Sequence, residues 1–277
     1  MQTTYLPHSQ IDDPTSHETS LTPADDGLMT EIPAPAELVE SLRTTWRSPV
    51  ELTSPDALTP EENAEVPQVW LTALKMPAAE GVRHMVDQWE RVIPGRLPLT
   101  TQRLREAAFA LYLGRRGDEL VLVYALSGTF GRKTYSTLVC TAPQPEPVSV
   151  DYIARIPLAL RAFHTQLHDE TESPLHGGMM AFADLELVSA YDDPRWPMTI
   201  DGRDPQFDPD VDYPDLSRVV LMFNDAASSR VCVNLTDDPD STAGWDWFEG
   251  SMDRMPDFWA QLDGRLAQGI SDWSDDR

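Results

Sequence analysis

The stretch that decides the fold is Ala107–Cys140, AAFALYLGRRGDELVLVYALSGTFGRKTYSTLVC. It contains three runs of apolar and β-branched residues, separated by the Gly-containing turns GRRGD and TFGRK. Such runs between turn residues are typical of β-strands. The stretch therefore predicts three antiparallel strands joined as a meander. Residues 101–112 also match the period of a helix, through Leu104, Ala108, Leu111 and Tyr112. We favour a strand for 107–113.

One amphipathic helix is predicted before the meander. Its apolar residues recur at helical spacing, and Pro94-Gly95 ends it. The stripe consists of Val82, Met85, Val86, Trp89 and Ile93.

Residues 1–66 are predicted to be an acidic, Pro-rich tail that is largely disordered. The first 35 residues are rich in Pro, Ser, Thr and Asp. They have too few large apolar groups for burial to offset the conformational entropy that the chain would lose on folding. A short helix is expected from Ala36, with Leu38, Val39, Leu42 and Trp46 on one face. The following stretch, SPVELTSPDALTPEENAEVP (48–67), is interpreted as a loop.

Beyond the meander, the sequence predicts a second set of helices and strands. Pro157 is expected to open a helix that buries Leu160, Phe163 and Leu167. Residues 179–190 fit a short strand leading into a helix, and 218–223 and 230–235 fit a hairpin. The remaining elements are a strand at 244–248 and a helix opened by Pro256, with an apolar stripe of Phe258, Trp259, Leu262, Leu266 and Ile270.

Charge divides the chain into three parts. The whole chain has 46 acidic and 21 basic residues, for a net charge of −25. Residues 1–66 have 13 acids and 2 bases, residues 67–145 have 6 and 10, and residues 146–277 have 27 and 9. The second change coincides with the Pro-rich TAPQPEP (141–147), where we place a boundary.

The basic middle part, a helix plus the meander, has two interpretations. It is either a segment that docks against the acidic C-terminal part or an extension of the C-terminal sheet. Its basic residues Arg115, Arg116, Arg132 and Lys133 lie in the predicted turns. They form either an exposed site or a solvated hairpin edge.

Several residues invite a chemical interpretation and a structural one. His164 and His168, four residues apart on the predicted helix, have metal-ligand spacing, but no third ligand is apparent and a structural role is favoured. Asp208, Asp210 and Asp212 alternate as in a calcium loop, yet the Gly and Glu of that loop are missing, which favours a solvated acidic loop. Cys140 and Cys232 are interpreted as buried free thiols in a reducing cytoplasm. No metal and no cofactor is predicted.

The C-terminal part resembles the SUKH superfamily over about 125 residues, roughly 147–274. Phe163-His-x-x-Leu-His-Asp169 after a Pro-started helix is similar to the family's "LPxxLRxFYxxHDG" opening. Pro174–Gly178 with Phe182–Tyr191 is similar to the segment that follows, and Val219–Asp225 with Val231–Asp237 to its hairpin. Trp245–Trp273 is similar to its final strand and Trp-bearing helix. The chain departs from the family at Asp169-Glu170, at Ser228–Arg230 and at Asn234.

The resemblance implies an α+β fold, with helices packed on an antiparallel or mixed sheet in residues 146–277. It also implies a function, because the superfamily includes Smi/Knr-type regulators and bacterial proteins that neutralise a cognate toxin. We therefore expect an immunity-type protein whose acidic surface covers the active site of a basic protein toxin. The alternative is a non-inhibitory scaffold of the same superfamily. The candidate contacts are Asp208, Asp210, Asp212, Asp225, Asp237, Asp238, Asp240, Trp245 and Trp247.

Composition and motifs argue against other classes. The negative charge disfavours nucleic acids and anionic membranes as partners. No run of about 18 apolar residues is present, and no secretory leader is recognised, so the expected location is the cytoplasm. No G-x-S-x-G, Walker-type or H-E-x-x-H motif occurs, so no catalytic residues are assigned and no enzyme activity is predicted.

Overall fold

The protein has an α+β fold, as the sequence predicts. The computed structural model describes residues 34–44, 49–130, 133–146, 152–174, 177–188, 214–225, 229–248 and 251–271. Its helices are α1 (Ala36–Thr44), α2 (Pro60–Glu65), α3 (Gln68–Leu74), α4 (Ala78–Val92), α5 (Pro98–Ala107), α6 (Leu158–Ala162) and α7 (Phe258–Ile270). Within the described part of the chain, no helix combines the length and apolar composition needed to cross a bilayer.

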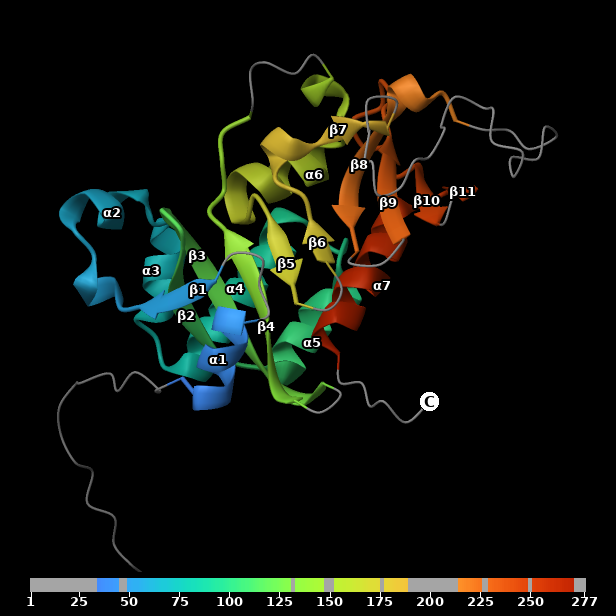
Figure 1. The fold of residues 1–277 in the computed structure, drawn as a ribbon. Helices are drawn as coiled ribbons and strands as arrows, with labels where there is room; N and C mark the ends of the chain where they lie inside the picture. Colours follow the sequence, from blue (N-terminus) through green and yellow to red (C-terminus); the bar gives the residue numbers. More distant parts are fainter. Residues whose placement is uncertain are drawn as a thin grey trace, which may run out of the picture. The chain divides into compact units, whose positions relative to one another are not determined.

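The strands form one antiparallel sheet (Figure 1). They are β1 (Val50–Thr53), β2 (Ala108–Arg116), β3 (Glu119–Phe130), β4 (Lys133–Thr141), β5 (Thr171–Ser173), β6 (Gly177–Met179), β7 (Glu186–Leu187), β8 (Val219–Asn224), β9 (Ser229–Asn234), β10 (Gly244–Phe248) and β11 (Ser251–Met255). The order is β1-β2-β3-β4-β5-β6-β8-β9-β10-β11, and β7 also pairs with β8.

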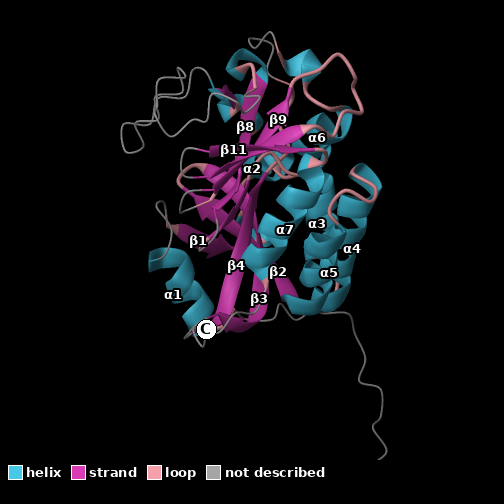
Figure 2. Cartoon of the chain, turned by 90° about the vertical axis from the view of Figure 1, so that its right-hand side faces the viewer, coloured by secondary structure: helices cyan, strands magenta, loops and turns pink. Residues whose placement is uncertain are grey.

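Helices cover both faces of the first half of the sheet (Figure 2). Alternate residues of β3, such as Leu122 and Tyr124, pack under α3, α4 and α5 in the main core. The residues between them, such as Val121 and Val123, face the other way, where Leu42 of α1 joins their cluster. Because both faces of β3 are buried, its sequence is an almost continuous apolar run and not an alternating one.

The meander and the long helix before it are confirmed. The helix buries the predicted stripe and ends before Pro94, and Gly95 adopts a positive φ of 69°. The ambiguous residues 101–112 divide between the two alternatives, because α5 runs to Ala107 and β2 starts at Ala108.

The loop predicted for residues 48–67 is wrong in part. This stretch contains β1, which pairs with β2, and α2, which starts with a capping box between Thr59 and Glu62. The helix from Ala36 is confirmed with Leu38 and Leu42 buried, whereas Trp46 lies outside the described residues.

The C-terminal elements follow the prediction with several corrections. The helix after Pro157 passes into a π-helical turn at Phe163–Leu167, so His168 lies beyond it in extended backbone. The helix expected within 179–190 is absent from the described residues, which hold a 3₁₀ turn at Phe182–Asp184 and the short β7. Strands β5 and β11 are missed by the sequence predictions. The last helix begins at Phe258, capped by Asp257, and buries the predicted stripe.

The boundary at 141–147 does not separate two sheets. β4 pairs with β5 across it, with Val139 opposite Glu172 and Cys140 opposite Thr171. The main core likewise contains residues from both sides. Of the two interpretations, the middle part extends the C-terminal sheet.

The basic middle part and the acidic C-terminal part are also joined through Asp263 of α7. Its carboxylate accepts hydrogen bonds from the backbone N–H of Leu99 (2.8 Å) and of Thr100 (2.7 Å) at the start of α5. The hydroxyl of Thr100 donates to the carbonyl of Asp263 at 3.2 Å. Asp263 therefore supplies the cap that α5 lacks in its own sequence, because Leu97 at that position has no capping side chain.

We expect Asp263→Ala to lower the free energy of unfolding by about 2 kcal/mol, since it leaves the buried N–H of Thr100 and the part-buried N–H of Leu99 without acceptors. Asp263→Asn retains one acceptor and should cost less. Urea unfolding monitored by Trp fluorescence measures both changes. Asp118→Ala, in the exposed β2–β3 turn, is the control. An equal loss for Asp118→Ala and Asp263→Ala would contradict the role of the cap.

Candidate protein-binding surface

Residues Thr236–Asp240, here called the acidic turn, connect β9 to β10 and are held by their own hydrogen bonds. The hydroxyl of Thr236 donates to the carbonyl of Asp238 (3.1 Å) and accepts from the N–H of Asp238 (3.2 Å). The carboxylate of Asp238 accepts from the N–H of Asp240 at 3.0 Å. These are the local side-chain-to-backbone bonds that Asp and Thr form in turns. They orient the acidic turn before any partner binds.

The acidic turn is anchored to the start of α6. The N–H of Leu158 donates to the carbonyl of Pro239 at 2.9 Å. Arg155 lies 3.8 Å from the carboxylate of Asp237 and also donates to the carbonyl of Leu235. The side chain of Asp237 is still 96% exposed, and Leu158 is 49% exposed. An exposed apolar side chain thus lies beside exposed carboxylates.

Further acids surround the acidic turn. The hydroxyl of Tyr152, near Arg155, donates to the carbonyl of Leu185, and burial together with the charge of Glu186 raises the pKa of Tyr152. Hydrogen bonds from Ser217 lower the pKa of Asp215, and the charges of Arg218 and Arg155 add to this effect. We name this region, seen with α6 and β7 at the top of Figure 1, the acidic surface. Its described charged residues are Asp184, Glu186, Asp215, Asp237, Asp238 and Asp240, with Arg155 and Arg218.

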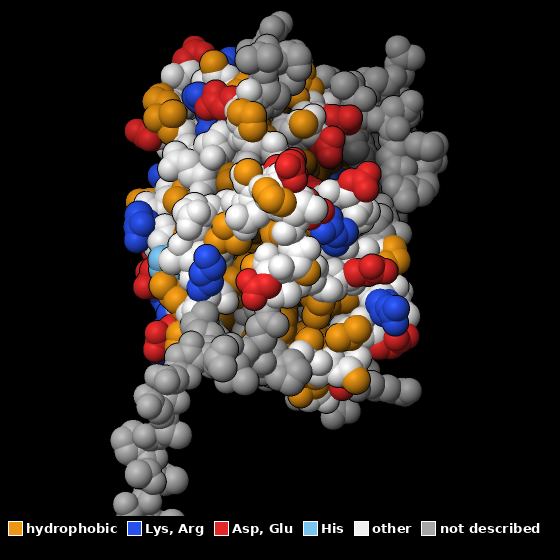
Figure 3. Space-filling model, turned by 90° about the vertical axis from the view of Figure 1, so that its left-hand side faces the viewer, with side chains coloured by type: hydrophobic (Ala, Val, Ile, Leu, Met, Phe, Trp, Pro, Cys, Tyr) orange, Lys and Arg blue, Asp and Glu red, His pale blue; other side chains and the backbone are white. Residues whose placement is uncertain are grey.

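The side of the molecule that carries α2 and β1 differs from the acidic surface in its charge. There, Lys and Arg side chains are interspersed with Asp and Glu among apolar side chains (Figure 3). Arg115 of β2 pairs with Glu62 of α2 at 2.8 Å. The charges on this side are therefore mixed in sign, unlike those of the acidic surface.

The structure groups only some of the predicted contact residues. Asp237, Asp238 and Asp240 are exposed together in the acidic turn. Asp225 lies elsewhere, where it accepts from the N–H of Ser229 at 3.0 Å and is 4.0 Å from Arg265. Asp208, Asp210 and Asp212 lie outside the described residues.

The two tryptophans among the candidate contacts lie in a core. Trp245 is 8% exposed and Trp247 is fully buried, in a cluster on the sheet face opposite the main core. The guanidinium of Arg230 lies 4.7 Å from the ring centre of Trp247. Both side chains face the same way, as their alternation with Asp246 predicts, but they form part of a core and not of an exposed contact surface.

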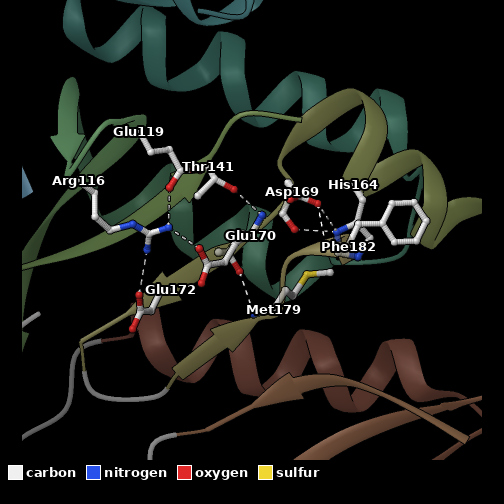
Figure 4. A network of polar contacts seen from close by, with 10 residues as sticks. Arg116, Glu119, Thr141, His164, Asp169, Glu170, Glu172, Met179 and Phe182 are labelled. Carbon is white, nitrogen blue, oxygen red and sulfur yellow. Dashed lines mark hydrogen bonds and ion pairs between the residues drawn. The ribbon is translucent and has the colours of Figure 1, made fainter. Parts of the chain in front are cut away.

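The prediction of an exposed basic site at the β2–β3 turn is wrong for Arg116. Its guanidinium bonds to Glu119 (3.0 Å), Glu170 and Glu172 (3.3 Å), and its side chain is only 16% exposed (Figure 4). Burial lowers the pKa of Arg116, but hydrogen bonds and charges of Glu170 and Glu119 raise it above the usual value. Glu170 and Glu172 belong to the acidic C-terminal part, so Arg116 forms ion pairs between the middle part and the C-terminal part within the continuous sheet. Arg132 lies outside the described residues, and the side chain of Lys133 is not described.

His164 and His168 are fully buried and contact different partners. Nδ1 of His164 lies 2.7 Å from the carbonyl of Asp169, and its ring stacks on Phe182 (Figure 4). Nε2 of His168 lies 3.1 Å from the hydroxyl of Tyr124, which accepts a hydrogen bond from Trp89. In the part of the chain that the structure describes, no three His, Cys, Asp or Glu side chains are grouped to hold a metal ion. These contacts support the structural role of the pair.

We expect His168 to make stability depend on pH. Burial lowers its pKa from 6.5 to about 3, so between these values the unfolded chain binds a proton that the folded protein does not. The free energy of unfolding should therefore fall as pH falls through this window, by up to about 1.4 kcal/mol per pH unit from this residue. Urea unfolding at a series of pH values measures the slope.

Two variants test the cause of that slope. His168→Gln retains a polar group for Tyr124 but cannot titrate, and it should give a shallower slope. Tyr124→Phe leaves the imidazole buried and should retain the slope. If His168→Gln and the unaltered protein lose stability in parallel, another group is responsible.

Comparison of the chain with protein-family models, with curated proteins and with solved structures gives no significant match. The description of the acidic surface therefore depends on the contacts of this chain alone. The resemblance to the SUKH superfamily stays a prediction from the sequence.

Proposed function

We propose that this protein is an immunity-type inhibitor, which binds a basic protein toxin through its acidic surface. The observation that carries the proposal is the acidic turn, whose carboxylates are exposed while its backbone is held by hydrogen bonds within the turn and by Leu158 of α6. A partner would then meet carboxylates on a backbone that is already ordered, which reduces the entropy lost on binding. Leu158 beside them offers the apolar contact that charged surfaces lack.

The inhibition we propose needs no chemical step. A toxin that acts on an anionic substrate has a cationic active site, and the acidic surface would occupy that site in place of the substrate. Six carboxylates against two guanidinium groups leave the described acidic surface net negative. Opposite charges on two proteins increase the rate of association and select the partner.

The buried polar groups support binding over catalysis. Tyr124, His168 and Trp89 bond to one another inside the core. Burial raises the pKa of both thiols, Cys140 and Cys232, which keeps them protonated and poorly nucleophilic. Buried free thiols also support our proposal that the protein acts in the cytoplasm.

The test starts with affinity capture from a lysate of the source cell at moderate salt, followed by mass spectrometry. We expect one stoichiometric basic protein that inhibits growth when expressed alone and not when co-expressed with this chain. The triple variant Asp237→Lys, Asp238→Lys, Asp240→Lys should lower the association rate by about tenfold or more at low salt. Stopped-flow fluorescence measures that rate.

A matched variant separates the acidic surface from net charge. Glu61→Lys, Glu65→Lys, Asp118→Lys makes the same change of charge at exposed positions on α2 and in the β2–β3 turn. It should retain most of the association rate and the protection. Equal losses in the two triple variants would overturn the assignment to this surface. Several weakly bound partners without protection would favour the scaffold alternative.

A further inference from the structure

We propose that the outer edge of β11, which pairs with no further strand among the described residues, binds an extended, basic segment of a partner protein, which adds to the sheet as a further antiparallel strand. This binding surface is separate from the acidic turn. It is defined by backbone hydrogen bonding at the end of the sheet and by the charges beside that edge.

The first observation is the position of β11 in the sheet. It is the last strand in the order and pairs with β10 on one side. Among the described elements, β10 is its main neighbour, and β11 ends the sheet on the right of Figure 1. A terminal strand has a row of N–H and C=O groups that do not bond within the sheet, and an extended chain can pair with them.

The register shows which residues offer these groups. Phe248 and Ser251 pair across a two-residue connection, so they form the hydrogen-bonded pair that closes the hairpin. Hydrogen-bonded and non-hydrogen-bonded pairs alternate along an antiparallel ladder. The backbone groups of Asp253 therefore point to β10, whereas those of Met252 and Arg254 point outward. Arg254 is the exposed one of these two residues.

The second observation is the charge beside the edge. Asp253 pairs with Asp246 across the β10–β11 ladder, and burial and the charges of Asp253 and Asp225 raise the pKa of Asp246. Arg265 of α7 lies 3.7 Å from Asp246 and 4.0 Å from Asp225. Arg265 thus lies near Asp246 and Asp225, whereas Asp253, opposite Asp246 in the ladder, is exposed. A basic side chain next to Asp253 would offset the repulsion between Asp253 and Asp246.

These two observations define the occupant. Side chains of an added strand alternate between the sheet faces, so every second residue would lie on the face of Asp253 and should be Lys or Arg. The residues between them share a face with Arg254 and should be uncharged. A second copy of this chain is the competing occupant. Two-fold antiparallel pairing centred on Asp253 or on Arg254 would set like charges opposite one another, whereas pairing centred on Met252 would not, so light scattering tests this occupant directly.

The probe is a fluorescent peptide of about ten alternating Lys and Thr residues, long enough to span a strand of ordinary length. Fluorescence anisotropy at low ionic strength measures its binding to the full chain. The control peptide alternates Lys and Pro, which preserves the charge but removes every second N–H and prevents strand pairing. We expect the control to bind at least about tenfold more weakly than the Lys–Thr peptide.

Two variants of one residue locate the binding. Arg254→Pro removes the outward N–H without breaking a bond to β10, and Arg254→Ala makes the same change of charge but retains the N–H. We expect Arg254→Pro to bind the Lys–Thr peptide at least about tenfold more weakly than Arg254→Ala. Circular dichroism and thermal melting confirm that both variants fold.

Three results would overturn the proposal. Equal binding of the two peptides to the unaltered protein would show charge attraction alone. Equal binding of the Lys–Thr peptide to the two folded Arg254 variants would place the peptide elsewhere. A dimer that Arg254→Pro dissociates, detected by light scattering, would identify a second copy as the occupant. Each result is independent of the proposed inhibition, because no toxin takes part.

Discussion

The carboxylate of Asp263 is the contact on which the arrangement of the two halves depends. Thr100 in the first turn of α5 is buried, and the first N–H groups of this helix have no acceptors within their own helix. Asp263, more than 160 residues later, supplies both acceptors from α7. The position of α7 is thereby tied to α5, and α5 leads directly into β2 of the meander. The helical layer and the sheet are thus joined at this point.

Local patterns in the sequence predict the elements that are long and regularly spaced. Apolar residues recur over several turns in α4 and in α7, and they occupy several consecutive positions in the strands of the meander. The missed elements lack such repeats. β1 and β5 have four and three residues, and β11 has two adjacent charged residues between two methionines. The capping box of Thr59 and Glu62 is a local signal that could have identified α2.

Charge composition suggested a boundary because it counts residues without their partners. Arg116 adds to the positive balance of the middle part, yet its carboxylate partners Glu170 and Glu172 are counted in the acidic part. Likewise, Arg115 pairs with Glu62. Of the predicted contact residues, the acids of the acidic turn are exposed, as their loop composition indicates. The burial of Trp247 and the anchoring of Pro239 by Leu158 depend on segments far apart in sequence, which no local pattern shows.

The pairing of β4 with β5 has a consequence for synthesis of the chain. A ribosome releases the meander before β5, β6 and α7 exist, so β4 emerges with an unpaired edge and α5 with an uncapped start. At about 5 to 20 residues per second, the wait for α7 lasts on the order of ten seconds. During this time the apolar faces of β3 lack part of their cover, and such exposed strand edges favour aggregation. We therefore expect chaperones to bind the nascent meander until β5 and α7 have been synthesised.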